Sequence, residues 1–594
     1  MAPRFIYKGA CAAGILAAVS GCATVEYRPS RAMPEISVQS AAGSIEHVTP
    51  PALPAEESAT NAPAQTETQT QPLSLTVEGA LVLALQHNQN LSVQEVNPAL
   101  QHTFVSEQRS VFDPVLVGSY TRTEDRLTRD FQVQTPLSVP DITGTGTQTV
   151  NILAPIETKA KTMTEAGSVG VTQHLPTGMD ISLTYDRTDT ELRNSTNNPN
   201  LVFSRDTDSD ERNLNLSITQ QLLRGGGLGV NLASLRQAKL DTLASDYELR
   251  GFTEDLVSQV EQTYWDCILA QRQIKIYEES LALAQAQADE VEERIRLGKL
   301  PEVERAGAVS EVAQRKSSLI DAHSTYDTLR LSLLRLVNPN NDSLRPVDLN
   351  LQSDPITPQI GLSGVDFSIQ LAQRMRPDLN QARLQIKRDD LEVVKTKNGL
   401  LPQLDLFLNI SKNLSETNYA ASFEGPSQDE DDDRYTTQVG AQFSYPLGNR
   451  AARARDTRSD LSRTRNMRAL ANMTQLVEQD VRAAYIEVGR AWEQIPATTA
   501  TRELQEQTMQ AEVEKFRLGR STVLLVTQAQ RDLLTAQIGE VQARTAYLKS
   551  IVNLYRLEGS LLERRGIRCP GRDPVALEES PSSLAAHYAK DENG

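Results

Sequence analysis

Two parts of the chain alternate between apolar and polar residues, the pattern of a β-strand with one covered face. In the stretch GMDISLTYD (residues 178–186) every second residue is apolar, and Leu404, Leu406, Leu408 and Ile410 repeat the pattern in the second half. Strands of about 9–11 residues with this alternation suit a wall that faces lipid on one side and water on the other. Alternation alone also fits the edge of a soluble β-sandwich.

Helical spacing replaces the alternation after each β region. Apolar residues recur at intervals of three and four with Arg, Glu and Gln between them, which is typical of helices packed on one side and wetted on the other. Two of these stretches are so long that, at 1.5 Å per residue, each spans about 100 Å. Shorter stretches suit stacking end to end beside each long helix, with polar outer faces that suit a water-filled tube. The predicted helical segments are 230–297 and 450–518 (long), and 91–110, 303–337, 379–398 and 524–557 (short).

The chain also repeats itself at low sequence identity. A shift of 221 aligns Val260 with Val481 and stays in register without a gap through the following helices. A shift of 288 aligns Pro114 with Pro402, so the first copy carries 288 − 221 = 67 extra residues inside its β region. We therefore predict two internal structural repeats, residues 75–338 and 365–562, joined by an inter-repeat linker at 339–364.

The number of predicted strands is too small to close a barrel. The second copy offers two strands, and the first offers two, or four if residues 168–186 form an added hairpin that turns at Pro176, Thr177 and Gly178. Open strand edges in lipid leave backbone groups unpaired at several kcal/mol each. We therefore expect several chains to share one barrel.

The N-terminus has the pattern of an export signal. Arg4 and Lys8 precede an uncharged stretch that is too short to cross a bilayer as a helix, which predicts a signal peptide over residues 1–21. Val19, Ser20, Gly21 and Cys22 resemble the bacterial lipobox, in which the cysteine receives a diacylglyceryl lipid and an acyl chain such as palmitate. Several acyl chains anchor a protein firmly to a membrane. An ordinary secretory signal is the alternative.

The residue after this cysteine bears on localisation. It is Ala23, not the aspartate that the resemblance associates with inner-membrane retention, so we expect the outer membrane. From there to residue 74 the chain is rich in Pro, Ala, Thr and Gln, and we interpret residues 22–74 as a lipidated flexible tether. Residues 563–594 are predicted to be a disordered C-terminal tail.

Charge and composition exclude several function classes. The net charge of −17 argues against a nucleic-acid-binding surface, because phosphate contacts need clustered Lys and Arg. Six scattered histidines and four distant cysteines give no metal-ligand spacing, and we predict no metal and no cofactor besides the lipid on Cys22. The chain has no phosphate loop and no Gly-x-Ser-x-Gly nucleophile motif. We therefore predict no catalytic residues and no enzyme activity.

The combination of features resembles a TolC-type outer membrane efflux protein, an outer membrane factor lipoprotein of Gram-negative bacteria. The resemblance covers the lipobox, the two repeats, and the segments QLLRGGG (residues 221–227) and YPLGNRAAR (445–453) that follow the strand pairs. It implies an α+β membrane protein: a homotrimeric transmembrane β-barrel in outer membrane lipid, continued into the periplasm by a long α-helical barrel. Three chains would give 12 or 18 strands, depending on the added hairpin.

This resemblance also implies a passive exit duct for a tripartite efflux or secretion system, joined to an inner-membrane pump through a periplasmic adaptor (membrane fusion) protein. The motif Arg-Leu-Gly plus a basic residue occurs at the end of both long helices. Under this resemblance each turn lies at a periplasmic tip where the adaptor docks; plain helix caps are the alternative. The predicted docking residues are Leu297, Gly298, Lys299, Leu518, Gly519 and Arg520.

Family members commonly narrow the tunnel with acidic residues just after the second turn, and this chain departs from that pattern. Leu525 and Gln528 stand where carboxylates are expected, whereas Glu302 and Glu304 follow the first turn. These four residues are the predicted pore constriction, through a carboxylate ring or an apolar narrowing. A structural coiled-coil lipoprotein that spans the periplasm without transport is the alternative function.

Overall fold

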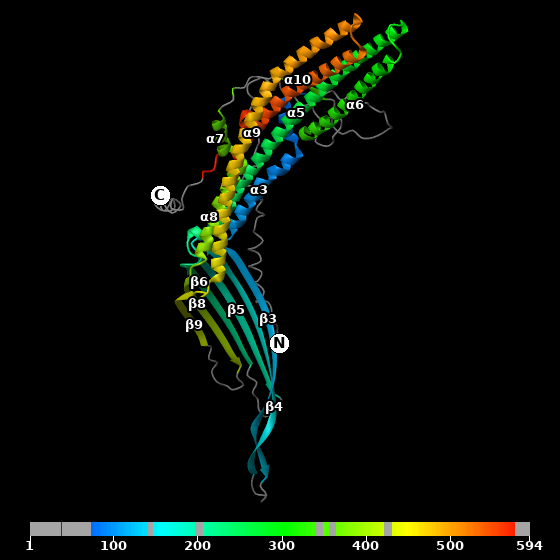
Figure 1. The fold of residues 1–594 in the computed structure, drawn as a ribbon. Coiled ribbons are helices and arrows are strands. Elements are labelled where there is room, and N and C mark those ends of the chain that lie inside the picture. The colour runs from blue at the N-terminus through cyan, green and yellow to red at the C-terminus, as the bar shows by residue number, and fades with distance from the viewer. Residues whose placement is uncertain are drawn as a thin grey trace, which may run out of the picture. The chain divides into compact units, whose positions relative to one another are not determined.

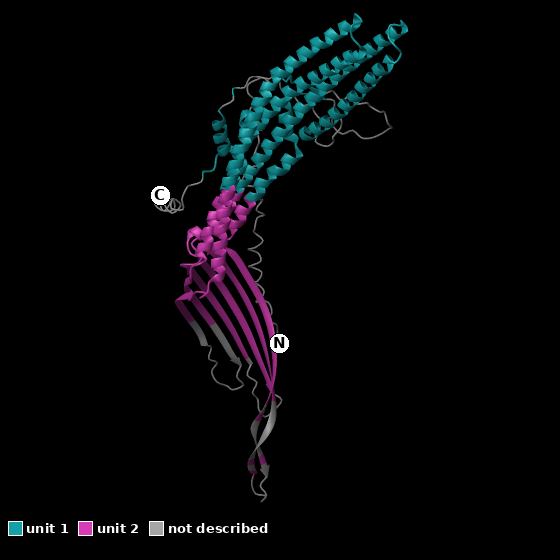
Figure 2. Cartoon of the chain, viewed as in Figure 1, with its two compact units in different colours: residues 1–101, 242–383, 470–594 teal, residues 102–241, 384–469 magenta. Residues whose placement is uncertain are grey.

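The computed structural model shows a mixed α and β protein with two compact units (Figures 1 and 2). One unit comprises residues 1–101, 242–383 and 470–594, and the other comprises residues 102–241 and 384–469. The structure describes residues 37–38, 73–140, 147–196, 206–338, 349–355, 361, 364–420 and 430–576. The predicted signal peptide and Cys22 lie outside these residues.

Two very long helices dominate the helical part. The stretches predicted at 230–297 and 450–518 correspond to helices α5 and α9, and the shorter stretches also form helices. Within the described residues, no helix is both long enough and apolar enough to cross a bilayer. The helices are α2 (Val77–His87), α3 (Gln89–Ser110), α4 (Leu228–Asn231), α5 (Ala233–Arg296), α6 (Glu304–Val337), α7 (Val365–Met375), α8 (Pro377–Asn398), α9 (Arg450–Arg517), α10 (Val523–Leu557) and α11 (Leu561–Arg564).

One six-stranded antiparallel sheet lies in the unit formed by residues 102–241 and 384–469. Its strand order is β3-β4-β5-β6-β8-β9, so the four strands of the first half and the two of the second join at the β6–β8 pair (Figure 1). The added hairpin is therefore part of the sheet. The strands are β3 (Val115–Pro140), β4 (Thr147–Leu175), β5 (Met179–Thr196), β6 (Asp206–Gln221), β8 (Gln403–Ala420) and β9 (Glu430–Ser444).

The turn between β4 and β5 lies where the sequence places it, at residues 176–178. Gly178 adopts a φ of 84°, a conformation that L side chains rarely adopt and that glycine reaches without steric cost. Its N–H donates to the Leu175 carbonyl oxygen at 2.9 Å, which closes the turn. The residues of the turn itself, Gly178 above all, therefore determine its tight conformation.

The core of the other unit is built around the buried Tyr264 on α5. Its hydroxyl donates to the carbonyl oxygen of Leu75 at 2.9 Å and accepts from the N–H of Ser353 at 3.3 Å. This places the tyrosine beside the short parallel pair of β2 (Leu73–Leu75) and β7 (Leu349–Leu351). Burying a large side chain contributes about 1.5–3 kcal/mol, so the packing of Tyr264 and its two hydrogen bonds together hold the short strands.

Parts of the predicted flexible tether and disordered tail are structured, which corrects the prediction for those parts. β2 lies at the end of the predicted tether and β7 within the predicted linker. Residues 563–576 pack against α5, and β10 (Ile567–Arg568) pairs with β1 (Ser37–Val38). The remaining tail, residues 577–594, lies outside the described residues.

A buried ion pair explains why the start of the tail is ordered. Glu261 on α5 is completely buried, and both its carboxylate oxygens accept from Arg565 at 2.6 Å. A buried carboxylate without a partner would cost several kcal/mol, so the segment that carries Arg565 stabilises this part of the fold. Ile567 is buried beside it.

Candidate functional site

The six-stranded sheet has one apolar and one polar face, and the register fixes which residues share each. Residues that pair directly across neighbouring strands lie on the same face of the sheet. One such row runs across five strands, from β3 through β4, β5 and β6 to β8, and consists of Leu116, Val171, Leu183, Leu216 and Ile410. Among the described side chains of strands β4 to β9, all large apolar residues that are strongly exposed lie on this face. They are Val171, Leu183, Tyr185, Leu214, Leu406, Leu414, Tyr435, Val439 and Phe443.

The height of this apolar band matches a membrane. Along β8 the apolar positions extend from Leu404 to Leu414, interrupted by Lys412. At 3.3 Å per residue and a strand tilt of about 40°, this stretch rises about 25 Å, which is the height of the apolar band on outer membrane barrels. Tyr120, Tyr185 and Tyr435 lie near its outer limit, where aromatic residues commonly flank such bands.

Charged pairs follow the apolar band on the same face. Arg187 contacts Asp210 at 2.9 Å, and Arg122 contacts Glu165 at 3.4 Å. These exposed pairs each contribute little to stability. They show that the apolar face ends at this level of the sheet.

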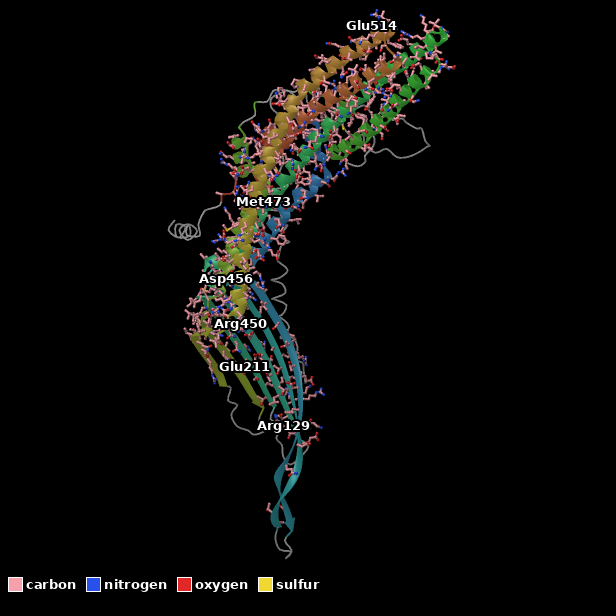
Figure 3. The ribbon with its side chains drawn as sticks, viewed as in Figure 1. Arg129, Glu211, Arg450, Asp456, Met473 and Glu514 are labelled. Atoms are coloured by element: carbon pink, nitrogen blue, oxygen red, sulfur yellow. The ribbon has the colours of Figure 1, made fainter. Side chains whose placement is uncertain are left out.

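The opposite face is mainly polar on strands β4 to β9, whereas β3 also exposes Val115, Val117 and Leu127 there. This face carries mainly hydroxyl and amide side chains, with the carboxylates of Asp180, Asp186 and Glu211 among them. Asp186 accepts from the Asn215 amide at 3.0 Å, and the Asp180 carboxylate lies 2.6 Å from the His174 Nδ1. Glu211 is labelled on this part of the sheet in Figure 3. Such a face suits water and not lipid.

The two predicted tips have the same backbone geometry. Gly298 has a φ of 68° and Gly519 a φ of 72°, so both require the left-handed conformation. The N–H of Lys299 donates to the Arg294 carbonyl at 2.9 Å, and the N–H of Arg520 donates to the Lys515 carbonyl at 2.8 Å. Both turns are therefore Schellman motifs, which explains why the glycine recurs.

A small apolar core joins the two tips. Phe516 from the last turn of α9 is buried together with Val291 on α5 and Val526 on α10. The Arg294 guanidinium lies 4.2 Å from the centre of the Phe516 ring and donates to its carbonyl oxygen at 3.1 Å. Figure 3 labels Glu514 close to this end of α9. The two hairpins therefore form one packed end.

Polar contacts order the turn that precedes α10. The Ser521 hydroxyl donates to Glu512 at 2.8 Å, and Lys515 contacts the same carboxylate at 2.5 Å; these hydrogen bonds lower the pKa of Glu512. The Thr522 hydroxyl accepts from the Leu525 N–H at 3.4 Å, as an N-cap residue does. These contacts fix where α10 begins.

The predicted docking residues remain exposed beside this packed end. Leu297 is 57% exposed and Leu518 is 71% exposed. Lys299 and Arg520 are exposed as well. Each tip therefore presents one large apolar side chain and one basic side chain to solvent.

The four predicted constriction residues lie near the tips on α10 and around the start of α6. Glu302 is exposed, 3.8 Å from Arg305, and Glu304 is half-buried. Leu525 and Gln528 are both exposed, on the side of α10 away from the buried core.

The sequence prediction missed a carboxylate on α10. Asp532 lies one turn beyond Gln528 and accepts from its amide at 2.9 Å. It follows Leu525 by seven residues and therefore shares its face of the helix. An acidic residue does follow the second tip, two turns later than Leu525, and helical periodicity alone would have identified it.

A second buried carboxylate links α6 to α10. Glu311 is 4% exposed and contacts Arg315 at 2.6 Å and the Nε of Arg531 at 3.0 Å. This network ties the two shorter helices together three turns behind the tips. In the described part of the chain, no three potential metal ligands gather into a site.

Comparison with known proteins places these features in a family. A family model described as "Outer membrane efflux protein" matches residues 172–338 and 368–560, which together make up more than half of the chain. The chain belongs to the outer membrane efflux protein family. The TolC-type resemblance is thus confirmed, and so are the outer-membrane location and the role of exit channel for efflux or secretion.

Named relatives of this outer membrane efflux protein include export and secretion components. "Pyoverdine export outer membrane protein OpmQ" of Pseudomonas putida is 26% identical over 379 residues, covering 62% of this chain and 74% of the relative. "Alkaline protease secretion protein AprF" of Pseudomonas aeruginosa is 25% identical over 256 residues, covering 41% of this chain and 48% of the relative.

Solved channel structures share the fold. The OprN outer-membrane channel gives a TM-score of 0.55 at 15% identity and covers 82% of this chain and 90% of its own. The CmeC channel of Campylobacter jejuni gives 0.56 at 14% identity and covers 91% and 98%. The likeness supports the fold of this efflux protein at the level of a single chain.

Proposed function

We propose that the protein is one subunit of a homotrimeric passive duct, in which the sheets close into a β-barrel and the helices form a periplasmic tunnel. Residues 1–21 are removed on export, and Cys22 carries the lipid anchor. Energy is supplied by an inner-membrane pump, and a periplasmic adaptor connects it to the tips. Export and secretion proteins both occur among the relatives, so the proposal covers both classes of system.

One observation carries this proposal: an open sheet has a membrane-high apolar face and a polar face. Strands β3 and β9 are its edges in the described structure. Unpaired edges in lipid cost several kcal/mol for each backbone group, whereas pairing β9 of one copy with β3 of the next removes both edges. Closure then places every apolar face toward lipid and every polar face toward the lumen.

The tips support an adaptor-docking role. Their backbone is held by the Schellman turns and the Phe516 core, so Leu297 and Leu518 are presented on a rigid support. A rigid support reduces the entropy cost of ordering these side chains when a partner binds. Lys299 and Arg520 add donors for an acidic or carbonyl-rich partner. Three chains supply six such tips.

The tunnel constriction is proposed to lie just behind the tips. Leu525 and Gln528 narrow it, and Asp532 adds a carboxylate on the same helical face. Glu302 and Glu304 form the matching pair after the first tip. A ring of carboxylates favours cations over anions, and this sets the selectivity expected of the closed duct.

Planar bilayers test conduction directly. The purified protein should give discrete single-channel currents that favour cations, and replacing Asp532 with Asn should reduce that preference. A structural lipoprotein would give no current, and this outcome would refute the duct.

A photo-crosslinking amino acid tests the docking surface. At Leu297 or Leu518 it should capture the adaptor in cells. The matched control is Leu504, which is 62% exposed on α9 away from the tip and should capture none. Equal capture at all three positions would refute tip docking.

A further inference from the structure

The hairpin formed by β4 and β5 accounts for the extra residues in the first half, and it is built as part of the sheet. β4 pairs with β5 from Leu175↔Met179 to Thr158↔Thr196, and β5 pairs with β6 from Met179↔Gln220 to Leu192↔Thr207. Both strands thus have hydrogen-bonded neighbours on each side. A flap outside the wall would leave β3 adjacent to β6, which is not the observed order.

Both hairpin strands follow the same division of faces as the rest of the sheet. Val171 and Leu183 lie on the apolar face, in one row with Leu216 of β6. Ser168 and Asp186 lie on the polar face. The hairpin therefore meets the conditions for a membrane wall, lipid on one side and water on the other, as fully as its neighbours do.

The hairpin turn is also anchored to the end of the sheet where the helices begin. The N–H of Gly227 donates to the Thr177 carbonyl at 3.1 Å, and the N–H of Gln221 donates to the Gly178 carbonyl at 3.0 Å. Gly178 allows the close approach, since a Cβ at this position would collide with the carbonyl oxygen of Gly225. The connection into α4 is therefore shaped around this turn.

We infer that the pore wall contains six strands from each chain, so that the proposed trimer forms an 18-stranded barrel with a mouth wide enough for cargo thicker than a single α-helix. For a strand spacing of about 4.8 Å and a tilt of about 40°, the backbone radius is about 18 Å with 18 strands and about 12 Å with 12. Side chains occupy about 5 Å on the inside, which leaves a lumen about 26 Å or about 14 Å across, and a helix is about 10–12 Å wide. The inference rests on the proposed trimeric duct and sets the size class of its cargo at the outer membrane.

A single spin label per chain measures the barrel width in the full-length trimer. Ser411 lies on the polar face of β8, outside the hairpin, and a label at Ser411→Cys forms a triangle around the barrel axis. The backbone separation between copies is expected to be about 31 Å for 18 strands and about 21 Å for 12. Cys267 is buried and Cys569 is half-buried, and burial raises the pKa of each thiol to about 12, which disfavours the reactive thiolate.

Deletion of residues 141–205 provides the matched variant. It joins β3 directly to β6 and keeps even-numbered residues of both strands on the apolar face, so a 12-stranded barrel remains possible. The label separation at position 411 should fall by about one third. A label at Leu504→Cys on α9 should keep its separation and report that the trimer is intact.

The outcomes separate this inference from the proposed function. A full-length separation of about 31 Å supports six strands per chain, whether or not the deletion variant folds. A full-length separation of about 21 Å, in protein that conducts current, overturns the wide barrel and leaves the duct standing. Labelled protein that is monomeric and carries no current overturns both.

Discussion

Replacing Phe516 with Ala should loosen both tips at once. Phe516 is 2% exposed and packs with Val291 and Val526, so it connects the end of α9 to α5 and α10. Its ring also supports the Arg294 guanidinium. The substitution removes a buried aromatic ring where few other apolar side chains can fill the space.

The expected cost follows from that environment. Truncating a buried Phe to Ala costs about 3–5 kcal/mol, and the lost cation–π contact adds about 0.5–2 kcal/mol. Taking about 4 kcal/mol, at roughly 1.4 kcal/mol per factor of ten, protection against local opening should fall about 700-fold. The effect should be local, because this core is separate from the larger core around Tyr264.

Hydrogen exchange followed by mass spectrometry measures this change. Peptides covering residues 288–297 and 513–520 should lose protection together in F516A, whereas peptides from α2 should not. The matched control is L518A, whose side chain is 71% exposed and whose loss should leave exchange unchanged. Unchanged protection in F516A, or loss confined to one tip, would refute the joint core.

Three further predictions concern the rest of the chain. Gly178→Ala should lower the temperature at which the assembled protein loses its compact gel mobility, because Gly178 has a positive φ and a Cβ there would collide with the Gly225 carbonyl oxygen. Gly229→Ala is the matched control and should leave this temperature unchanged, because open space surrounds Gly229. Arg565→Met should lower the free energy of unfolding by about 3–5 kcal/mol, because the buried Glu261 loses its partner. The double variant with Glu261→Met should recover most of this loss, and urea titrations measure both changes. Burial raises the pKa of Glu254 to about 8. The stability that the protonated Glu254 carboxyl contributes is therefore fully present below the ordinary pKa near 4.5 and is lost as pH rises through 8. Thermal scans from pH 5 to 9 should show this fall in the native protein and a flatter profile in E254Q.

The parts predicted from sequence are those that local chemistry determines. A period of two fixed which residues share a face of the sheet, and the Leu-Gly turns were identified because glycine is favoured where a helix ends at positive φ. The early part of the tail was missed because Arg565 and Glu261 are 304 positions apart, and a Pro-rich composition around such a residue indicates disorder. Phe516 gave no signal of its own, since only the fold shows that it faces the other tip.

The sheet-to-helix connections of the two halves differ, and the one after β6 contacts the added hairpin. In the second half, which has no such hairpin in the described sheet, the sheet-to-helix connection uses a single positive-φ residue, Asn449, whose amide donates to the Leu400 carbonyl at 3.1 Å. In the first half, Gly225 and Gly227 both adopt positive φ, and each contacts the turn around Gly178. The space for this contact comes from Gly178, whose missing Cβ would collide with the Gly225 carbonyl oxygen, whereas Gly225 and Gly227 are favoured by their positive φ. The added hairpin and the connection into α4 are therefore joined by hydrogen bonds at this turn, and the close contact depends on Gly178.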